Sequence, residues 1–459
     1  MIEFSFNQAA QIVNGRLHAA VNAKQRFVGM THDSRQAGNE NLYAALPGER
    51  VDGHDFVGAA AQAGASLALV QYPVEADISQ LEVDDVLTAM GQLAAAWREA
   101  LDVDVVGITG SNGKTTVKNM LAAIVNRHLT SRSVASDALL ATPGNYNNEI
   151  GLPLTLATLS DQHQFAILEM GCAKPGDIRY LAELARPAVG VVTNASAAHL
   201  KGLGSVEGVA ETKGEMFEAL SADDSAVINR DDRFFDVWLN RARPARVLSF
   251  GLHDEADVRL DDDGYVQTPL GNFALNLKLP GRHNQLNALA ATAAAIALGI
   301  GLDAISAGLD QAHAEPGRLQ QRPQPDGWLL IDDSYNANPA SMRAAIDVLA
   351  EQAGARWLVI GDMAELADQA QDEHAAIGKA AREAGLDRLF AFGPLAAIST
   401  QAFGTGGQAF EKIETLIGEL QSSIQAHLPQ SLTCLIKGSR SMRMERVVAA
   451  LNEHGAGTC

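Results

Sequence analysis

The chain has 459 residues, of which 47% are hydrophobic and 20% are charged, and its formal net charge is −20. That length exceeds one ordinary domain and predicts about three, each large enough to bury a core. A surface this acidic repels nucleic acid and anionic membranes, although a local basic pocket can still hold a small anion. We therefore expect small-molecule substrates, with no nucleic-acid or membrane partner.

The three cysteines, Cys172, Cys434 and Cys459, are far apart in the sequence. This spacing indicates a reducing compartment and no cysteine-bound metal cluster, and we interpret Cys172 as a small buried thiol rather than a nucleophile. Residues 2–15 lack the basic start of a secretory signal, and no apolar run approaches the ~20 residues of a membrane span. We expect a monomeric, cytoplasmic protein.

The first predicted domain covers residues 1–84. Short apolar strands at 41–46 and 67–71 flank a helical stretch at 56–63, which indicates a small α/β unit. A helical linker at 85–101 then leads into the rest of the chain.

The predicted central domain covers residues 85–315. Apolar, β-rich runs alternate with helical stretches, an order that predicts a mostly parallel sheet. The predicted strands lie at 103–109, 165–170, 189–193 and 226–229. Turn signals within 258–279 predict a β meander, and the alanine-rich stretch 284–298 predicts a helix.

The predicted third domain covers residues 316–459, and its strands are again separated by helical stretches. These strands lie at 328–331, 357–360, 389–392 and 433–436. The fold class is therefore α/β: a small N-terminal domain, a central phosphate-loop domain with a meander, and a Rossmann-like C-terminal domain.

A glycine-rich segment, GITGSNGKTT at 107–116, lies between the first central strand and a helix. Glycines allow the backbone to approach a phosphate, and the helix N-terminus supplies partial positive charge. Lys114 would contact the β and γ phosphates, and Thr115 would offer its hydroxyl to Mg²⁺. The nucleotide-binding residues expected here are Gly110, Ser111, Asn112, Gly113, Lys114, Thr115 and Thr116.

This loop departs from the strict Walker spacing, because Ile108 occupies the position of the first glycine. The departure argues against an ordinary GTPase or motor. The alternative is a glycine-rich turn followed by a surface lysine, which the combination of strand, GKTT and helix disfavours.

The variant loop resembles that of the Mur ligase family, the amide ligases of peptidoglycan precursor synthesis. The family's other motifs follow in order along essentially the whole chain. They are DSR at 33–35, ALPGERVDGHDF at 45–56, TPGNYNNEIGLP at 142–153, LEMG at 168–171, TNASAAHLKGLGS at 193–205, ETKGE at 211–215, GRHNQLNALAA at 281–291, EPGR ending at Arg318, IDDSYNANPASM at 331–342, GDMAEL at 361–366 and KGSRSM at 437–442.

SYNANP together with GDMAEL resembles the family member that adds D-alanyl-D-alanine, and the DNPR signature of the diaminopimelate-adding enzyme is absent. The resemblance implies an ATP-dependent ligase that converts the carboxylate of UDP-N-acetylmuramoyl-tripeptide into an acyl phosphate and joins it to the dipeptide. ATP and Mg²⁺ are the implied cofactors.

Glu169 and His199 follow apolar strands, so both should face the crevice at the carboxyl edge of the parallel sheet. Carboxylate is a natural Mg²⁺ ligand, whereas His199 as a metal ligand depends mainly on the resemblance. Lys213 precedes GEMF at the expected start of a helix, where a solvated lysine is the default. The resemblance implies instead that Lys213 carries a carbamate and becomes a metal ligand. It also implies catalytic roles for Lys114, His199 and Lys213.

Asn284 and Asn287 stand three residues apart on one helix face, and their amides suit an adenine edge. A helix N-cap remains the alternative for Asn284. By resemblance, Arg318 contacts ATP and Asp333 holds its ribose.

The expected substrate contacts come from all three domains. Ser34 and Arg35 would contact the uridine nucleotide, Asn145, Asn147 and Asn148 the muramoyl substrate, and Asn336, Asn338 and Lys437 the amine. NANP is equally compatible with a helix start, with Asn338 as cap and Pro339 at the first helical position. Two other functions remain open: a folate polyglutamating enzyme, and a nucleotide-binding regulator.

Overall fold

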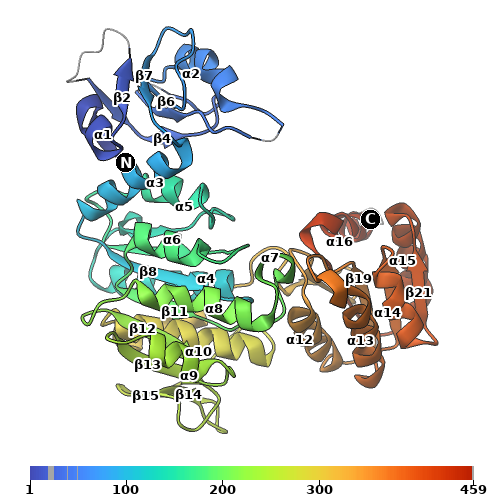
Figure 1. Cartoon of the computed structure of the whole chain (residues 1–459). Helices are drawn as coiled ribbons and strands as arrows, with labels where there is room; N and C mark the ends of the chain where they lie inside the picture. Colours follow the sequence, from blue (N-terminus) through green and yellow to red (C-terminus); the bar gives the residue numbers. More distant parts are fainter. Residues whose placement is uncertain (19–24, 39, 49, 457–459) are drawn as a thin grey trace.

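The computed structural model describes residues 1–18, 25–38, 40–48 and 50–456. Glu49, inside the motif at 45–56, lies outside the described residues, as do Asn39 and Cys459. The described chain forms three large sheets in succession along the sequence and one two-stranded sheet (Figure 1). In the part of the chain so described, no helix has the length and apolar character to cross a membrane.

The N-terminal domain is built on a five-stranded sheet with the order β2-β7-β6-β5-β4, beside which β1 pairs with β3. Its strands are β1 (Glu3–Ser5), β2 (Arg16–His18), β3 (Arg26–Val28), β4 (Met30–Thr31), β5 (Leu42–Ala44), β6 (Leu67–Val70) and β7 (Ser79–Glu82). Helices α1 (Phe6–Ile12) and α2 (Val57–Ala63) complete it. The two predicted strands and the predicted helix are present.

The predicted helical linker is α3 (Val86–Glu99), and it is packed rather than exposed. Its residues Met90 and Leu93 belong to the core of the N-terminal domain, and Ala94 belongs to the core of the central domain. Arg98 donates hydrogen bonds to the carbonyls of Ala185 and Val103. The helix therefore joins the two domains through buried contacts.

The central sheet has nine strands in the order β16-β15-β14-β13-β12-β11-β8-β10-β9. They are β8 (Asp104–Thr109), β9 (Leu139–Ala141), β10 (Phe165–Glu169), β11 (Val189–Val192), β12 (Ser225–Asn229), β13 (Arg246–Gly251), β14 (Val258–Leu260), β15 (Tyr265–Thr268) and β16 (Gly271–Ala274). Pairing is parallel from β9 through β14 and antiparallel in the β14-β15-β16 meander. After β8 the chain forms β9 and β10 on one side of that strand and then crosses to form β11 on the other side. The sheet therefore has a topological switch point at the end of β8.

Helices cover both faces of the central sheet. The long helix α4 (Lys114–Ser131) packs with α10 (Arg282–Ala297) and α11 (Leu302–Asp310) on one face. The opposite face is covered by α5 (Gly151–Leu156), α6 (Asp177–Ala185), α8 (Val206–Glu218) and α9 (Phe235–Arg241). The short helix α7 (Leu200–Leu203) projects toward the C-terminal domain (Figure 1).

The C-terminal domain has a six-stranded sheet with the order β17-β18-β22-β19-β20-β21, in which β17 alone is antiparallel to its neighbour. The strands are β17 (Gln320–Pro323), β18 (Leu329–Asp333), β19 (Ala355–Gly361), β20 (Arg388–Phe392), β21 (Gly407–Phe410) and β22 (Leu432–Lys437). One face carries α12 (Pro339–Ala350), α13 (Ala370–Glu383) and α14 (Ala396–Phe403), and the other carries α15 (Ile413–His427) and α16 (Glu445–Ala456).

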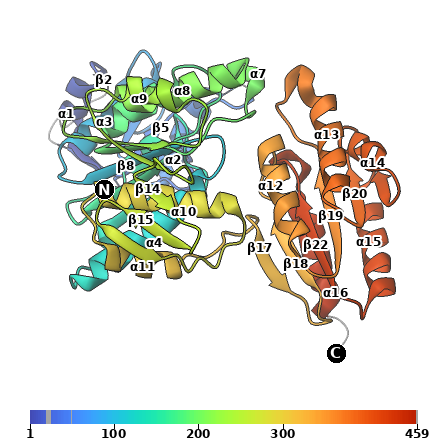
Figure 2. The same ribbon diagram turned by 90° about the horizontal axis from the view of Figure 1, so that it is seen from below.

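The C-terminal domain lies beside the central domain and is joined to it by the segment between α11 and β17 (Figure 2). In this segment Gly317 and Leu319 have positive φ values, +75° and +51°. Arg318 lies between them. The chain therefore bends sharply on either side of this arginine.

Candidate active site

A cavity of about 770 Å³ opens at the carboxyl edge of the central sheet, between that sheet and the C-terminal domain. Most of the residues singled out from the sequence line it. These are Ser111 to Thr116, Asn145, Asn147, Asn148, Glu169, His199, Asn284, Asn287, Arg318, Asp333, Asn336, Asn338 and Lys437. Gly110, Lys213, Ser34 and Arg35 are not part of this lining.

The phosphate loop connects β8 to α4 and depends on two glycines. Gly110 has a φ of +151°, and a Cβ there would lie 1.7 Å from Thr193 Oγ1. Gly113 has a φ of +84°, and a Cβ there would lie 2.2 Å from Asn287 Oδ1. Lys114 Nζ donates to the Gly110 carbonyl at 2.8 Å, which holds the ammonium group over the loop. The loop thus combines close backbone approach with a fixed cation, as a phosphate-binding turn requires.

The carboxylate of Glu169 connects three parts of the site. Glu169 is the last residue of β10 and is 4% exposed. It accepts hydrogen bonds from Thr115 Oγ1 at 2.7 Å and from Asn147 Nδ2 at 2.8 Å. Thr115 Oγ1 in turn accepts from Arg318 Nη2 at 2.9 Å. The phosphate loop, the 142–153 loop and the start of the C-terminal domain therefore meet at one anionic group.

Lys213 lies in the middle of α8, so the expectation that it opens a helix is wrong. The solvated alternative is also wrong, because Lys213 is 1% exposed and its Nζ contacts Cys172 Sγ at 3.6 Å. Cys172 is buried, as expected. Burial lowers the pKa of Lys213 to about 8, and no ion pair to this lysine occurs within the described ranges. The lowered pKa leaves a larger share of Lys213 as the neutral amine, which is the form that reacts with CO₂.

His199 occupies the N-cap of α7 with a φ of +55°. Its Nδ1 lies 2.5 Å from Glu365 Oε2, in the GDMAEL motif of the C-terminal domain. Burial lowers the pKa of His199, and the nearby Lys114 and Lys213 lower it further while Glu365 opposes them. These shifts favour the neutral imidazole, which is the form that binds metals.

Asn284 and Asn287 are both buried on α10, which begins at Arg282 with Gly281 as its N-cap. The N-cap alternative for Asn284 is therefore wrong. Its Nδ2 donates to the Pro280 carbonyl at 2.7 Å, and its Oδ1 accepts from Asn287 Nδ2 at 3.2 Å.

In the C-terminal domain, Lys437 Nζ donates to Asp333 Oδ2 at 2.6 Å and to the Asn336 carbonyl at 3.0 Å. Asp333 also accepts from the backbone N–H of Leu319 at 3.1 Å, which fixes the chain beside Arg318. Lys437 is therefore tied to the predicted ribose-binding carboxylate.

Asn338 is the cap of α12, which confirms one of the two roles that the sequence left open, and its contact with the amine stays a prediction. Its side chain caps α12 by accepting from the backbone N–H of Ser341, with Pro339 in the first turn. Its Nδ2 also donates to Asn112 Oδ1 of the phosphate loop at 2.8 Å.

The structure does not bring Ser34 and Arg35 to this cavity. Both lie in the N-terminal domain, where Arg35 forms an ion pair with Asp33 at 2.8 Å. Their expected contact with a uridine nucleotide therefore requires a substrate long enough to reach from this domain to the cavity.

Sequence reasoning missed several residues at the site. Tyr335 lines the cavity, with the Arg318 guanidinium 4.3 Å from its ring centroid, and its position inside SYNANP was the available signal. His283 also lines the cavity, and burial followed by the charge of Lys437 lowers its pKa to about 4. Glu365, the partner of His199, was also missed, and its position in the GDMAEL motif was the available signal.

Comparison with known proteins identifies the family. Residues 26–98 match the model of the Mur ligase family catalytic domain, residues 108–295 the Mur ligase middle domain, and residues 317–440 the Mur ligase glutamate ligase domain. The chain belongs to the Mur ligase family.

Individual relatives match over nearly the whole length. The UDP-N-acetylmuramoyl-tripeptide–D-alanyl-D-alanine ligase of Escherichia coli (strain K12) is 40% identical over 468 aligned residues, covering 100% of both chains. The crystal structure of MurF from Acinetobacter baumannii has 35% identity and a TM-score of 0.91, covering 98% of this chain and 99% of that one. MurF from Thermotoga maritima, in complex with ADP, has 27% identity and a TM-score of 0.81, covering 94% and 99%.

Proposed function

We propose that this chain is an ATP-dependent ligase that joins D-alanyl-D-alanine to UDP-N-acetylmuramoyl-tripeptide. The observation that carries the proposal is the shared cavity. It is lined by the phosphate loop and Glu169 from the central domain and by Asn336, Asn338 and Lys437 from the C-terminal domain. A carboxylate activated at the loop can therefore meet an amine delivered from the other side.

The proposed reaction has two steps. A carboxylate oxygen of the tripeptide attacks the γ phosphorus of ATP, and ADP leaves. The dipeptide amine then attacks the carbonyl carbon of the acyl phosphate, loses a proton and expels phosphate. Such phosphoryl transfer depends on positioning and on cations. Lys114, bonded to the Gly110 carbonyl, and Arg318, bonded to Thr115, supply fixed positive charge at the loop.

Mg²⁺ fits the residues present once Lys213 is modified. The described residues contain no group of three or more histidine, cysteine, aspartate and glutamate side chains placed to hold a metal. The amine of Lys213 can add CO₂ and release a proton, which yields a carbamate with anionic oxygens. That carbamate would join the oxygen ligands of Thr115 and Glu169, which are of the kind Mg²⁺ prefers, and the imidazole of His199, which the family resemblance adds. Bound there, the ion would shield the charge of the transferring phosphate.

The proposed ligands are shared among the three domains. Residues 1–84 bind the uridine nucleotide through Ser34 and Arg35, and residues 85–315 bind ATP. Asn284 and Asn287 contact the adenine, and Asp333 contacts the ribose. Residues 316–459 bind the dipeptide, while Asn145, Asn147 and Asn148 contact the muramoyl substrate. The cytoplasm, which supplies ATP, is the proposed site of reaction, and a monomer remains our prediction.

An ADP-release assay tests this function. With ATP and Mg²⁺ present, release should require both UDP-N-acetylmuramoyl-tripeptide and D-alanyl-D-alanine, and omitting either should abolish it. Release with a folate and glutamate would favour the polyglutamating alternative. Hydrolysis independent of both substrates would favour a nucleotide-binding regulator.

A further inference from the structure

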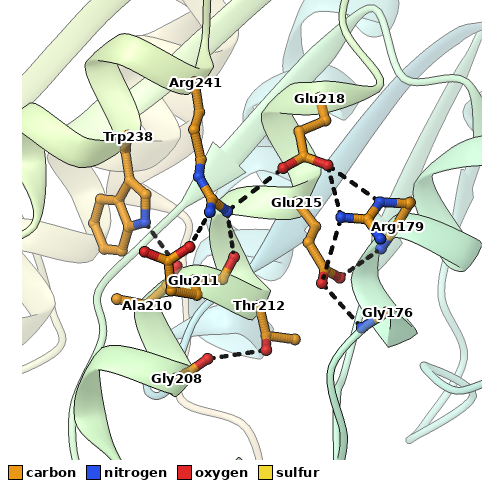
Figure 3. Close-up of polar contacts among 10 residues, drawn as sticks. All are labelled: Gly176, Arg179, Gly208, Ala210, Glu211, Thr212, Glu215, Glu218, Trp238 and Arg241. Carbon is orange, nitrogen blue, oxygen red and sulfur yellow. Dashed lines mark hydrogen bonds and ion pairs between the residues drawn. The ribbon is translucent and has the colours of Figure 1, made fainter.

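Glu215 is a buried carboxylate that the proposed reaction does not use. It lies on α8, two residues after Lys213, and is 6% exposed. Its Oε1 accepts from the backbone N–H of Gly176 at 2.9 Å, and its Oε2 accepts from that of Arg179 at 3.1 Å (Figure 3). Gly176 is the N-cap of α6 and has no side chain to bond the first turn. Glu215 therefore supplies, from another helix, the acceptor and negative charge that a helix N-terminus favours.

This contact joins α8 to the segment that follows Glu169. The chain runs from Glu169 at the end of β10 through Cys172 to Gly176 at the start of α6. Lys213 Nζ contacts Cys172 in that segment, and Glu215 bonds Gly176 and Arg179 at its far end. Two residues of α8 thus hold the short connection that carries Glu169.

Helix α9 holds α8 from another direction. Trp238 Nε1 donates to the Ala210 carbonyl at 2.9 Å, and Arg241 Nη1 donates to the Glu211 carbonyl at 2.7 Å (Figure 3). Gly214 packs so closely that a Cβ there would lie 3.0 Å from Trp238 Cδ1. With α9 fixing one side, the buried bonds of Glu215 join α8 to the start of α6, beside the partly exposed Arg179–Glu218 ion pair and the shared apolar core.

We propose that Glu215 is a positioning residue that sets α8 against the 171–176 segment, so that the Lys213 amine lies where a carbamate can share a metal with Glu169. The inference depends on the proposed role of Lys213. Capping of α6 alone would make Glu215 a purely structural residue. The two roles differ in what happens to the lysine when the protein stays folded.

The test compares Glu215→Gln with Glu218→Gln. Glu218 lies on the same helix and bonds the same Arg179, at 2.9 Å, but is 37% exposed. Full-length protein is equilibrated with ¹³C-bicarbonate, the carbamate is measured by ¹³C NMR, and Tm is recorded in parallel. We expect Glu215→Gln to need about tenfold more bicarbonate for half-occupancy, an effect of the size seen when groups behind metal ligands are removed. Ligation by this variant should recover partly when bicarbonate is raised, and Glu218→Gln should match the wild type.

Wild-type carbamate occupancy in Glu215→Gln, with only Tm lowered, would overturn the inference. If that variant does not fold, Glu215→Asp provides the test, because it keeps the negative charge on a shorter side chain. Lost carbamate occupancy in Glu215→Asp supports the positioning role, and full occupancy refutes it. Wild-type protein that condenses no substrates would contradict the proposed function itself. An active, carbamylated wild type beside an unchanged Glu215→Gln would contradict only the role of Glu215.

Discussion

At Lys213 the demands of stability and of the proposed chemistry are opposed. Burial lowers the pKa of this lysine from 10.5 to about 8, so the folded chain carries an ammonium group that is poorly solvated. We expect Lys213→Met to raise the free energy of unfolding by about 3 kcal/mol at pH 7 in CO₂-free buffer, while ligation is lost. The difference in the free energy of unfolding between the two proteins should have its full size below pH 8. It should vanish as pH approaches 10.5, because between these values the folded wild type binds fewer protons than its unfolded chain.

Denaturant unfolding of both proteins across this pH range measures the difference directly. A Lys213→Met variant that is less stable than the wild type at pH 7 would contradict the account of a poorly solvated ammonium group.

The carbamate itself predicts a specific pattern of loss and rescue. Lys213→Ala should be inactive and should regain part of its activity when a short carboxylic acid fills the gap beside Cys172. Lys213→Arg should be inactive as well, since guanidinium keeps its charge and forms no carbamate. ADP release measured with and without added acid provides the comparison. An arginine variant with most of its activity intact would make Lys213 a plain cation.

Lys114 provides the test of the phosphate loop. Its ammonium bonds only the Gly110 carbonyl among the described partners, so Lys114→Ala should fold normally. Ligation should fall by about 10²–10³-fold, the usual effect of removing a fixed charge or donor that stabilises a transition state. Lys201→Ala, at an exposed position on α7, is the matched control and should stay active. Near-normal ligation by Lys114→Ala would exclude the loop from the reaction.

At the scale of the element, substitutions of Asn338 can distinguish its role as the cap of α12 from its contact with the phosphate loop of the central domain. Asn338→Ala removes both the cap of α12 and the bond to Asn112, and it should cost about 1 kcal/mol of stability. Asn338→Asp keeps a good cap and should cost almost nothing, but it cannot donate to Asn112 Oδ1. Both variants should therefore bind an ATP analogue more weakly, and thermal unfolding with titration calorimetry separates the two effects. Tight binding by Asn338→Asp would leave capping as the sole role.

The elements that could be predicted from the sequence are those with long apolar runs. β8, β10 and β11 are buried on both faces and read as continuous hydrophobic segments, whereas the edge strands β9, β17 and β21 have short or polar sequences and were missed. The helix boundary at Lys213 was misplaced because α8 begins earlier, at Val206, with the side chain of Ser205 as its N-cap. A single lysine inside a helical pattern carries no sign of its burial, which depends on the elements packed against α8, among them α6, α9 and β11.

At the scale of the molecule, the C-terminal domain meets the central one through a few polar contacts. These include Arg318 to Thr115, Asn338 to Asn112, and Glu365 to His199. Contacts of this kind permit domain motion. We expect small-angle scattering to show a smaller radius of gyration with an ATP analogue and UDP-N-acetylmuramoyl-tripeptide together than without them. Identical curves would remove support for closure around the reacting groups.

Most of the candidate site could be predicted because its residues lie in motifs at strand ends. The carboxyl edge of a parallel sheet collects such ends into one crevice, so Glu169 and the phosphate loop could be placed together. The pairing of Glu365 with His199 could not be predicted, because it depends on how the central and C-terminal domains pack against each other. The distance of Ser34 and Arg35 from the cavity has the same origin.

The bend at Arg318 places consecutive residues of the connection in contact with both domains. The guanidinium of Arg318 donates to Thr115 Oγ1, in the loop where phosphate would bind. From Leu319 onward the chain enters the C-terminal sheet, and Asp333 of that sheet accepts a hydrogen bond from the backbone N–H of Leu319. A nucleotide bound at Thr115 would therefore touch the first residues of the C-terminal domain through Arg318, and those residues are bonded in turn to the sheet that carries Asp333.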